Sequence, residues 1–455
     1  MKIRFCAASL ALLLAACAPL PRAVPDNAQV TLPAAWSEAA GAAAPAPIAP
    51  DWWRQLGDAQ LDALVAEALA HNSDLLTALA RVDEARANWA ATDAARSPTL
   101  NAAAAAQSGR SLGAFGPAHT RSVQPGLQAA WEVDLWGRLA QQAQAAGERL
   151  QATRADRDAV ALAVAAATAQ TYIGLRSLQA QYAIADATVQ SRESALELAR
   201  DQQRVGYISQ LQLTQAEAEL HNVRQQVQQI DLSIRRQTIA LNTLVGRAGG
   251  SVGDGTLQAL QLPLPPASLP AQLLERRPDI ARAAHLLAAA SHQIGAERAA
   301  FMPQVTLSAS VGSLLVNALQ YNPLTVWSMG GSLLAPLFDG GRREAALDAA
   351  AARRDQAAYA YRGAVLAAFA DVENALVASV RLAQQTEQAV QRRDVLQRSL
   401  GFAHDRYEAG YASYLEELDA QRNLFQAELD VVRLRQAELD NRVLLFKALG
   451  GGWQE

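Results

Sequence analysis

No group of side chains in the sequence has the types and spacing of an enzyme's active site. The six histidines are His71, His119, His221, His285, His292 and His404. One pair, His285 and His292, is spaced by a heptad, and a solvated helix face explains this pair better than a metal does. There is no His-Glu-x-x-His pair, glycine-rich phosphate loop or nucleophile elbow. The sequence therefore predicts a protein that is not an enzyme and that binds neither a metal nor a cofactor.

The polar residues with the most informative spacing lie in Ser122–Arg138, where apolar and polar faces alternate. The apolar face carries Val123, Pro125, Leu127, Ala129, Trp131, Val133 and Leu135. The opposite face carries Gln124, Gln128, Glu132 and Asp134. This is the period of a two-faced strand, and a long helical pattern begins at Arg138. We therefore expect a duct that crosses a membrane as a sheet and continues as helix. The four polar residues would line its lumen, although Glu132 and Asp134 could instead contact neighbouring chains.

The N-terminus has the pattern of a secretory signal. Lys2 and Arg4 precede a short apolar run that ends in the sequence LAAC at Cys17. This is similar to the lipobox of bacterial lipoproteins, so we expect residues 1–16 to be removed and Cys17 to carry acyl chains. Ala18 favours delivery to the outer membrane by the same resemblance, and the alternative is an ordinary signal peptide with an incidental cysteine. Residues 17–50, rich in alanine and proline, are expected to form a lipid-anchored extended arm.

The rest of the chain consists of two copies of one repeating unit. Pro98 matches Pro303 at an offset of 205. Further matches at an offset of 204 pair Arg138, Gly206, Tyr207, Ser209 and Gly246 with Arg342, Gly410, Tyr411, Ser413 and Gly450. A length of 455 residues would suggest about three domains, and the duplication replaces that expectation. The predicted organisation is repeat 1 at 51–246, a linker at 247–269, repeat 2 at 270–450 and a tail at 451–455.

Each copy is expected to contain a helix, two strands, a long helix and a return helix. The ranges in copy 1 are a helix at about 59–95, a loop at 109–121 and a long helix at about 138–204. In copy 2 the first helix is expected at about 270–300, the loop at 317–323 and the long helix at about 342–407. Proline ends each first helix, and the return helices end at Gly246 and Gly450. At a rise of about 1.5 Å per residue, each long helix would extend roughly 100 Å.

Both long helices end in a sharp turn with the same chemistry. Gly206 and Gly410 stand where a helix C-terminus favours a residue that tolerates left-handed geometry. Three residues later, Ser209 with Gln212 and Ser413 with Glu416 fit the capping box that opens a helix. The sequence therefore predicts two tight helix-turn-helix tips.

The strand number predicts an assembly of three chains. Four membrane strands leave unpaired backbone groups in hydrocarbon, so the chain must share a barrel with other copies. Two chains would give eight strands, which side chains fill completely, whereas three would give twelve and an open lumen. Alanine-rich stretches such as 159–170 suit close packing in a hollow helical cylinder. The net charge of -4 gives no indication of nucleic acid, and no run of 18 or more apolar residues follows the N-terminus.

These features resemble the TolC-type outer membrane factors, in particular the OprM- and NodT-like efflux lipoproteins. The resemblance covers nearly all of the mature chain. Its most specific motifs are DWWRQLGDAQLDALVAEAL at 51–69, NSDLLTALARVDEARA at 72–87, EVDLWGR at 132–138, ERRPDI at 275–280, PLFDGGRR at 336–343 and LDAQRNLF at 418–425. It implies a mainly α homotrimer whose twelve-stranded transmembrane β-barrel continues as a periplasmic α-helical barrel. It also implies docking to a periplasmic adaptor and an inner-membrane pump of the RND type.

The resemblance also assigns roles to residues at the tips. The expected adaptor-docking residues are Arg204, Val205, Gly206, Tyr207, Ser209, Ala409, Gly410, Tyr411 and Ser413. The expected periplasmic gate consists of Tyr407, Leu415, Glu416 and Asp419, with Asp419 forming a ring of carboxylates in a trimer. Leu415 and Asp419 lie four residues apart and hence on one helix face. Copy 1 has Gln215 in place of Asp419, and the alternatives are a purely structural turn and an exposed acidic face.

Two other functions compete with small-molecule efflux through a passive outer-membrane duct. The same duct could serve a type I protein-secretion system, although the lipobox and the motif at 51–54 favour the efflux branch. A non-conducting periplasmic coiled-coil tether would belong to a different class of protein. The alternating strands argue against a tether, since a tether has no use for strands with two faces.

Overall fold

The computed structural model describes residues 25–31, 33, 35–37, 48–113, 116–253, 255–263 and 276–452. The predicted signal peptide and Cys17 lie outside the described residues. The chain divides into two compact units, and each unit draws on both halves of the sequence. Of the described residues, the first unit contains those from 25–30, 80–154 and 282–363, and the second contains those from 31–79, 155–281 and 364–452.

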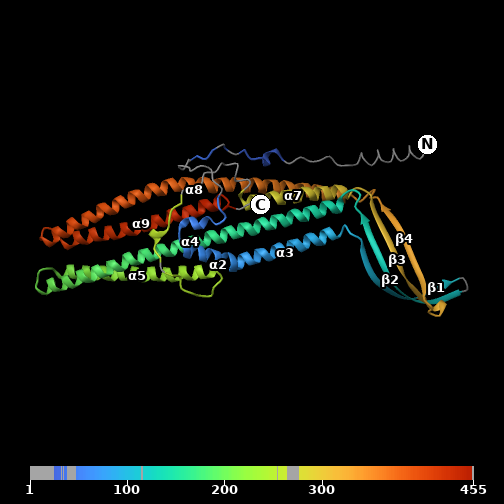
Figure 1. Cartoon of the computed structure of the whole chain (residues 1–455), viewed down its shortest axis with the longest axis horizontal. Coiled ribbons are helices and arrows are strands. Elements are labelled where there is room, and N and C mark those ends of the chain that lie inside the picture. Colours follow the sequence, from blue (N-terminus) through green and yellow to red (C-terminus); the bar gives the residue numbers. More distant parts are fainter. Residues whose placement is uncertain are drawn as a thin grey trace. The chain divides into compact units, whose positions relative to one another are not determined.

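The first unit holds one curved antiparallel sheet (Figure 1). Its strands are β1 (Thr99–Gly113), β2 (Gly116–Val133), β3 (Gln304–Val316) and β4 (Leu324–Leu334), in the order β1-β2-β3-β4. All four predicted strands are present, including β1, whose alternation is weak. The loop predicted at 109–121 is wrong, because Arg110 pairs with His119 and the ladder continues to Gly113. Cross-strand pairing there overrides a local composition typical of loops.

The register of the sheet places polar residues of all four strands on one face. Asn101 pairs with Gln128, Gln128 pairs with Ser310, and Ser310 pairs with Ser328. The Ser310 and Ser328 hydroxyl oxygens lie 2.9 Å apart. The opposite face is apolar along the same strands, and its exposed large side chains include Leu100, Leu127, Trp131, Leu307, Val311, Trp327, Met329 and Leu333. The sheet therefore has one polar and one apolar face, as the alternation predicts.

The helices follow the duplicated order. They are α2 (Ala59–His71), α3 (Ser73–Ala94), α4 (Arg138–Arg204), α5 (Gln210–Leu244), α7 (Pro278–Ala299), α8 (Arg342–Glu408) and α9 (Tyr414–Ala448). Short 3-10 turns lie at Asp26–Ala28, Trp52–Leu56, Leu257–Ala259 and Asn317–Leu319. The helices α4 and α8 contribute residues to both units.

The single helix predicted at 59–95 is wrong, because the chain breaks at Asn72. Asn72 is extended, its side-chain oxygen accepts from the Asp74 and Leu75 amides, and its side-chain nitrogen donates to Leu244 O at 2.9 Å. The side chain thus opens α3 and caps α5. Arg277, at the matching position of copy 2, donates to Ala448 O at 2.9 Å. The same junction is therefore built twice with different residues.

The largest core cluster lies in the second unit. Trp52 is fully buried and its ring stacks on Phe446 at 5.3 Å. Around this pair, α2, α4, α5, α8 and α9 contribute buried aliphatic and alanine side chains. The segment that begins with the DWWRQL motif is thus fixed to both return helices through one apolar core.

Two helices, α4 and α8, contain stretches long and apolar enough to cross a membrane by length and composition. Each helix has 67 residues, over three times the ~20 residues that a span requires, and much of its apolar content is alanine. The apolar stretch of α8 is only 28% buried within one chain. We interpret both helices as walls that pack against other helices.

Candidate functional site

The two tips are turns with exposed residues at their ends. Gly206 and Gly410 have φ angles of 75° and 78°, a left-handed conformation that glycine adopts without strain. All nine predicted docking residues are exposed. Three of them are apolar or aromatic side chains, with exposed fractions of 77% for Val205, 70% for Tyr207 and 81% for Tyr411. Exposed apolar and aromatic groups at a tip are typical of a binding surface.

The capping chemistry differs between the tips. Ser209 and Gln212 form the predicted capping box at the start of α5. The prediction of a second box at Ser413 is wrong, because the Ser413 side chain makes no capping hydrogen bond. Its expected partner Glu416 instead pairs with Arg406 at 3.0 Å. A charged guanidinium within reach attracts the carboxylate more strongly than the backbone amide of the cap does.

The predicted gate residues divide into exposed and packed side chains. Leu415 is 48% exposed and the side chain of Asp419 is 64% exposed, so both are available to surroundings outside the chain. The Arg422 guanidinium lies 4.0 Å from Asp419. Tyr407 is half-buried, donates to Gln202 Oε1 at 3.2 Å and lies 5.8 Å from the Tyr414 ring. The structure thus brings Tyr407, but not Leu415 or Asp419, into the contact between α8 and α4.

Sequence reasoning missed a group of buried ionisable residues beneath the tips. Arg422 of α9 donates two hydrogen bonds to Glu219 of α5, at 2.7 and 2.9 Å. Glu219 and the nearby Arg192 of α4 are 3% and 4% exposed. The pKa of Arg192 is lowered by burial, while Glu219 opposes that shift. These charges couple the α4/α5 and α8/α9 hairpins.

A second missed contact joins α8 to α9. His404 Nδ1 lies 2.9 Å from Glu417 Oε1, and Glu417 is only 6% exposed. The duplication carries a signal for it, since Glu417 occupies the position of Leu213 at the offset of 204. Leu213 belongs to an apolar cluster with Leu220, Tyr414 and other residues. A carboxylate in place of a core leucine marks a residue that needs a partner.

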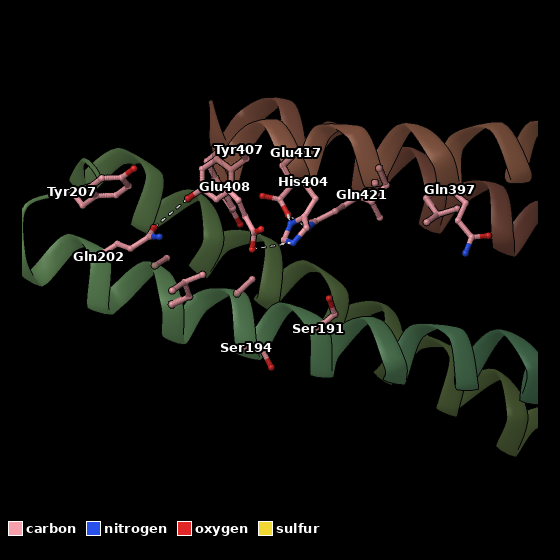
Figure 2. A pocket seen from close by; sticks show the side chains of 17 residues that line it. Ser191, Ser194, Gln202, Tyr207, Gln397, His404, Tyr407, Glu408, Glu417 and Gln421 are labelled. Carbon is pink, nitrogen blue, oxygen red and sulfur yellow. Dashed lines mark hydrogen bonds and ion pairs between the residues drawn. The ribbon is translucent and has the colours of Figure 1, made fainter. Parts of the chain in front are cut away.

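A cavity of about 1030 Å³ lies beside this contact. Figure 2 shows Gln202 and Tyr207 of the first tip on one side, and Tyr407, His404 and Glu417 on the other. The hydrogen bond from Tyr407 to Gln202 crosses between the two sides. Among the described residues, no group of three or more His, Cys, Asp or Glu side chains could hold a metal ion.

The predicted lumen residues within β2 are exposed, whereas those at the end of the strand have binding partners. Gln124 and Gln128 lie within the strand and are exposed. Glu132 is in the strand but binds Arg138 through both carboxylate oxygens at 2.8 Å. Asp134 lies beyond the strand, and its carboxylate accepts from the backbone amides of Leu139 and Ala140. The prediction that Asp134 continues the alternation is therefore wrong, because a helix N-terminus attracts its charge.

Comparison with known proteins identifies the class. The family model described as "Outer membrane efflux protein" matches residues 64–247 and again 269–451. The chain is 34% identical to the pyoverdine export outer membrane protein OpmQ of Pseudomonas aeruginosa, over 98% of this chain and 96% of that protein. It is 34% identical to the cation efflux system protein CusC of Escherichia coli O6:H1, over 89% and 88% of the two chains.

A solved structure agrees with this match. The outer-membrane channel OprN has a TM-score of 0.87 and 28% identity, over 96% of this chain and 100% of that one. The chain therefore belongs to the outer membrane efflux protein family and is an outer membrane efflux channel. The tether alternative is excluded by this membership.

Proposed function

We propose that three copies of this chain form a passive exit duct that receives small molecules from a periplasmic adaptor and an inner-membrane pump of the RND type. The observation that carries the proposal is the four-stranded sheet, which has one polar face, one apolar face and two edges that no other described strand covers. Such a sheet is stable in a membrane only when other strands cover both edges. Three copies give twelve strands around a lumen lined by Gln124 and Gln128.

The duplication supports a definite register for the shared barrel. Thr99 pairs with Ala130 and Gln304 pairs with Leu334, so β1 matches β3 at an offset of 205 and β2 matches β4 at 204. Within the chain, Gln128 of β2 pairs with Ser310 of β3. Applying both offsets to that pair places Ser332 of β4 opposite Ala105 of β1 in the next copy.

This register keeps like faces together across the joint between copies. The same offsets set Met329 opposite Ser108 and Leu333 opposite Ala104, all on the apolar face of the sheet. The joint within the chain is tightest at Gly126 and Gly312, where an added Cβ on Gly312 would lie 2.5 Å from Pro125 O. The match of Gly126 is Gly330, where an added Cβ would meet no atom of the described residues within 4 Å.

The exposed surface of α8 supports the same assembly. Only 28% of its apolar stretch is buried within one chain, and alanine on several faces permits close contact with helices of neighbouring copies. Phe338 and Leu337, between β4 and α8, are 93% and 95% exposed. Large side chains this exposed next to an open sheet edge are suited to contact with another copy.

We assign the gate to Leu415 and Asp419, with Tyr407 holding α8 to α4, and adaptor docking to the exposed tip residues. Three Asp419 carboxylates around the axis would favour cations and resist passive leakage of anions. Arg422 at 4.0 Å reduces this field without removing it, because most of the Asp419 side chain remains in water. Glu416 is paired with Arg406 and is assigned to the tip fold.

The remaining assignments follow from position and from relatives. Cys17 is proposed as the lipidated residue that anchors the chain to the outer membrane, with the rest of the helical part in the periplasm. The relatives OpmQ and CusC are named for export of pyoverdine and efflux of cations, and both are small solutes. Small-molecule efflux is therefore favoured over protein secretion.

Single-channel recording in planar bilayers tests the proposal. The full-length lipidated protein is expected to give small cation-selective openings. Asp419→Ala is expected to reduce both cation conductance and cation selectivity, because it removes the carboxylates that attract cations. Asp430→Ala, which removes a carboxylate also on α9, serves as a matched control and should leave selectivity unchanged. Unchanged conductance and cation preference in Asp419→Ala would contradict the gate assignment.

A further inference from the structure

The contact between His404 and Glu417 joins the end of one helix to the start of the next across the second tip. His404 bridges two carboxylates, with Nδ1 at 2.9 Å from Glu417 and Nε2 at 3.3 Å from Glu408. Only 8% of the Glu417 side chain is exposed, whereas 52% of the His404 side chain is. The histidine therefore joins a buried acid to an exposed one at the edge of the cavity.

Glu417 also lies between the two gate residues in sequence. Leu415 and Asp419 flank it on α9 and point to surroundings outside the chain, while Glu417 faces inward with Leu418 and Tyr414. Gln421 Nε2 donates the second hydrogen bond to Glu417 Oε1, at 3.0 Å. Fixing Glu417 thus fixes the first turns of the helix that carries the gate.

The charged groups around the contact come from all four tip helices. From α8, Asp405 and Glu408 act on His404 together with Glu417 of α9. Arg192 of α4 interacts electrostatically with Glu417, and Glu219 of α5 and Arg422 of α9 pair with each other. Three carboxylates thus act on one imidazole, while the Arg406 guanidinium of α8 pairs with Glu416.

We propose that His404 and Glu417 form a proton-sensitive clasp that holds the start of α9 against α8, and that loss of the proton from His404 frees the gate segment to open. The proposal rests on the duct function proposed above. When His404 is neutral, its imidazole can still donate one hydrogen bond, but the ion pair with Glu417 is lost at a position that copy 1 fills with leucine. The hydrogen bond from Gln421 and the charge of Arg192 then remain as further support. The free energy of the first turn of α9 is then lower when Glu417 moves toward water.

The direction of the pH dependence follows from the carboxylates. The hydrogen bond with Glu417 raises the pKa of His404 above its ordinary value, and Glu408 and Asp405 add to this while burial opposes it. The clasp is therefore complete below pH ~6.5, the ordinary histidine value, and is lost as pH rises through the raised pKa. Burial raises the pKa of Asp440 on α9 to about 6, so this group also titrates at the acidic end of the range, and the His404→Gln variant separates its contribution from that of His404.

Bilayer recordings of the full-length trimer between pH ~6 and ~9 test the clasp, in wild type and in His404→Gln and Glu417→Gln. Open probability of the wild type is expected to rise at least about fivefold across this range. His404→Gln removes the titrating group and should abolish the step, and Glu417→Gln should move it to lower pH. His285→Gln is the matched control, since His285 contacts Glu148 at 2.8 Å far from the tip in sequence and should keep the wild-type step.

Amide hydrogen exchange of residues 409–420 gives a second readout that needs no conductance. At pH ~6 wild type should exchange more slowly than His404→Gln, and the two should converge at pH ~9. A wild type without a pH step in either measurement, or a step that persists in His404→Gln, would overturn the clasp. Absence of any conductance together with a normal exchange step would contradict the duct function and support the clasp.

Discussion

Two buried carboxylates on α9 differ in their surroundings. Glu417 has His404 and Gln421 as hydrogen-bond partners. Asp440 has Gln436 on one oxygen at 3.2 Å, and its Oδ1 has no partner within the described part of the chain. Burial raises the pKa of Asp440 to about 6. A group so placed weakens the fold when it is ionised.

Asp440→Asn is therefore expected to stabilise the protein at neutral and alkaline pH. Because the folded-state pKa is raised, the wild type loses stability as pH rises from about 4 to above 6, and the variant does not. The gain should be about 1–3 kcal/mol at pH ~8 and small at pH ~4. Thermal unfolding of both proteins at the two pH values measures it. A gain that is equal at both values would show that ionisation of Asp440 is not the cause.

At the residue scale, the sequence predicted which secondary-structure element each residue belongs to better than it predicted the side chains that the residue contacts. The alternation in β2 correctly placed Gln124 and Gln128 on the polar face. The predicted strand continued past Val133 to Asp134, because the nearby helix N-terminus was not weighed against the strand pattern. The burial of Glu417 was not predicted, because two adjacent carboxylates, Glu416 and Glu417, are typical of a solvated helix face. Only comparison with Leu213 of the other copy indicates that it is buried.

At the element scale, the duplication predicted the order of helices and strands, and three-dimensional pairing decided where they end. The long helices α4 and α8 begin at the predicted residues. The break at Asn72 was not predicted, because the apolar pattern continues across it and its partner, Leu244 O, lies far along the chain. Strand ends at Gly113 and Gly116 likewise depend on pairing between the strands.

The two tips offer a matched test of capping. Ser209 accepts from the Gln212 amide, whereas the Ser413 side chain makes no capping bond. Ser209→Ala should therefore weaken the first turn of α5 by about 1 kcal/mol, and Ser413→Ala should weaken α9 by much less. Amide exchange in the first turn of each helix measures the difference directly. Equal acceleration in both variants would mean that Ser413 caps its helix as well.

At the scale of the whole molecule, the central claim is that copies of the chain complete one another's sheet. The sequence predicted this need from four strands and a membrane, and the register proposed for the joint applies the offsets of 205 and 204 to the pairing within one chain. The number of chains depends on curvature and on contacts between copies, which no local pattern contains. Family membership supports an outer membrane channel, while the joint between β4 and β1 follows from the duplication.

Disulfide trapping of that joint is the most direct test. The only cysteines are Cys6 and Cys17 in the N-terminal segment, so a pair introduced in the sheet has no competing thiol among the described residues. Ser332→Cys with Ala105→Cys should form a bond between copies, because paired Cα atoms in antiparallel strands lie about 4.5–5.5 Å apart. Ser332→Cys with Ala103→Cys, two residues out of register on the same face, is the matched control.

The Ser332/Ala105 cysteine variant, purified from outer membranes and run without reductant, is expected to migrate as a covalent trimer that reductant converts to monomer. The control pair should remain monomeric. Covalent dimers as the end product would contradict three copies per barrel. Equal trapping of both pairs would contradict the register, and a chain that stays monomeric in both would contradict the shared barrel.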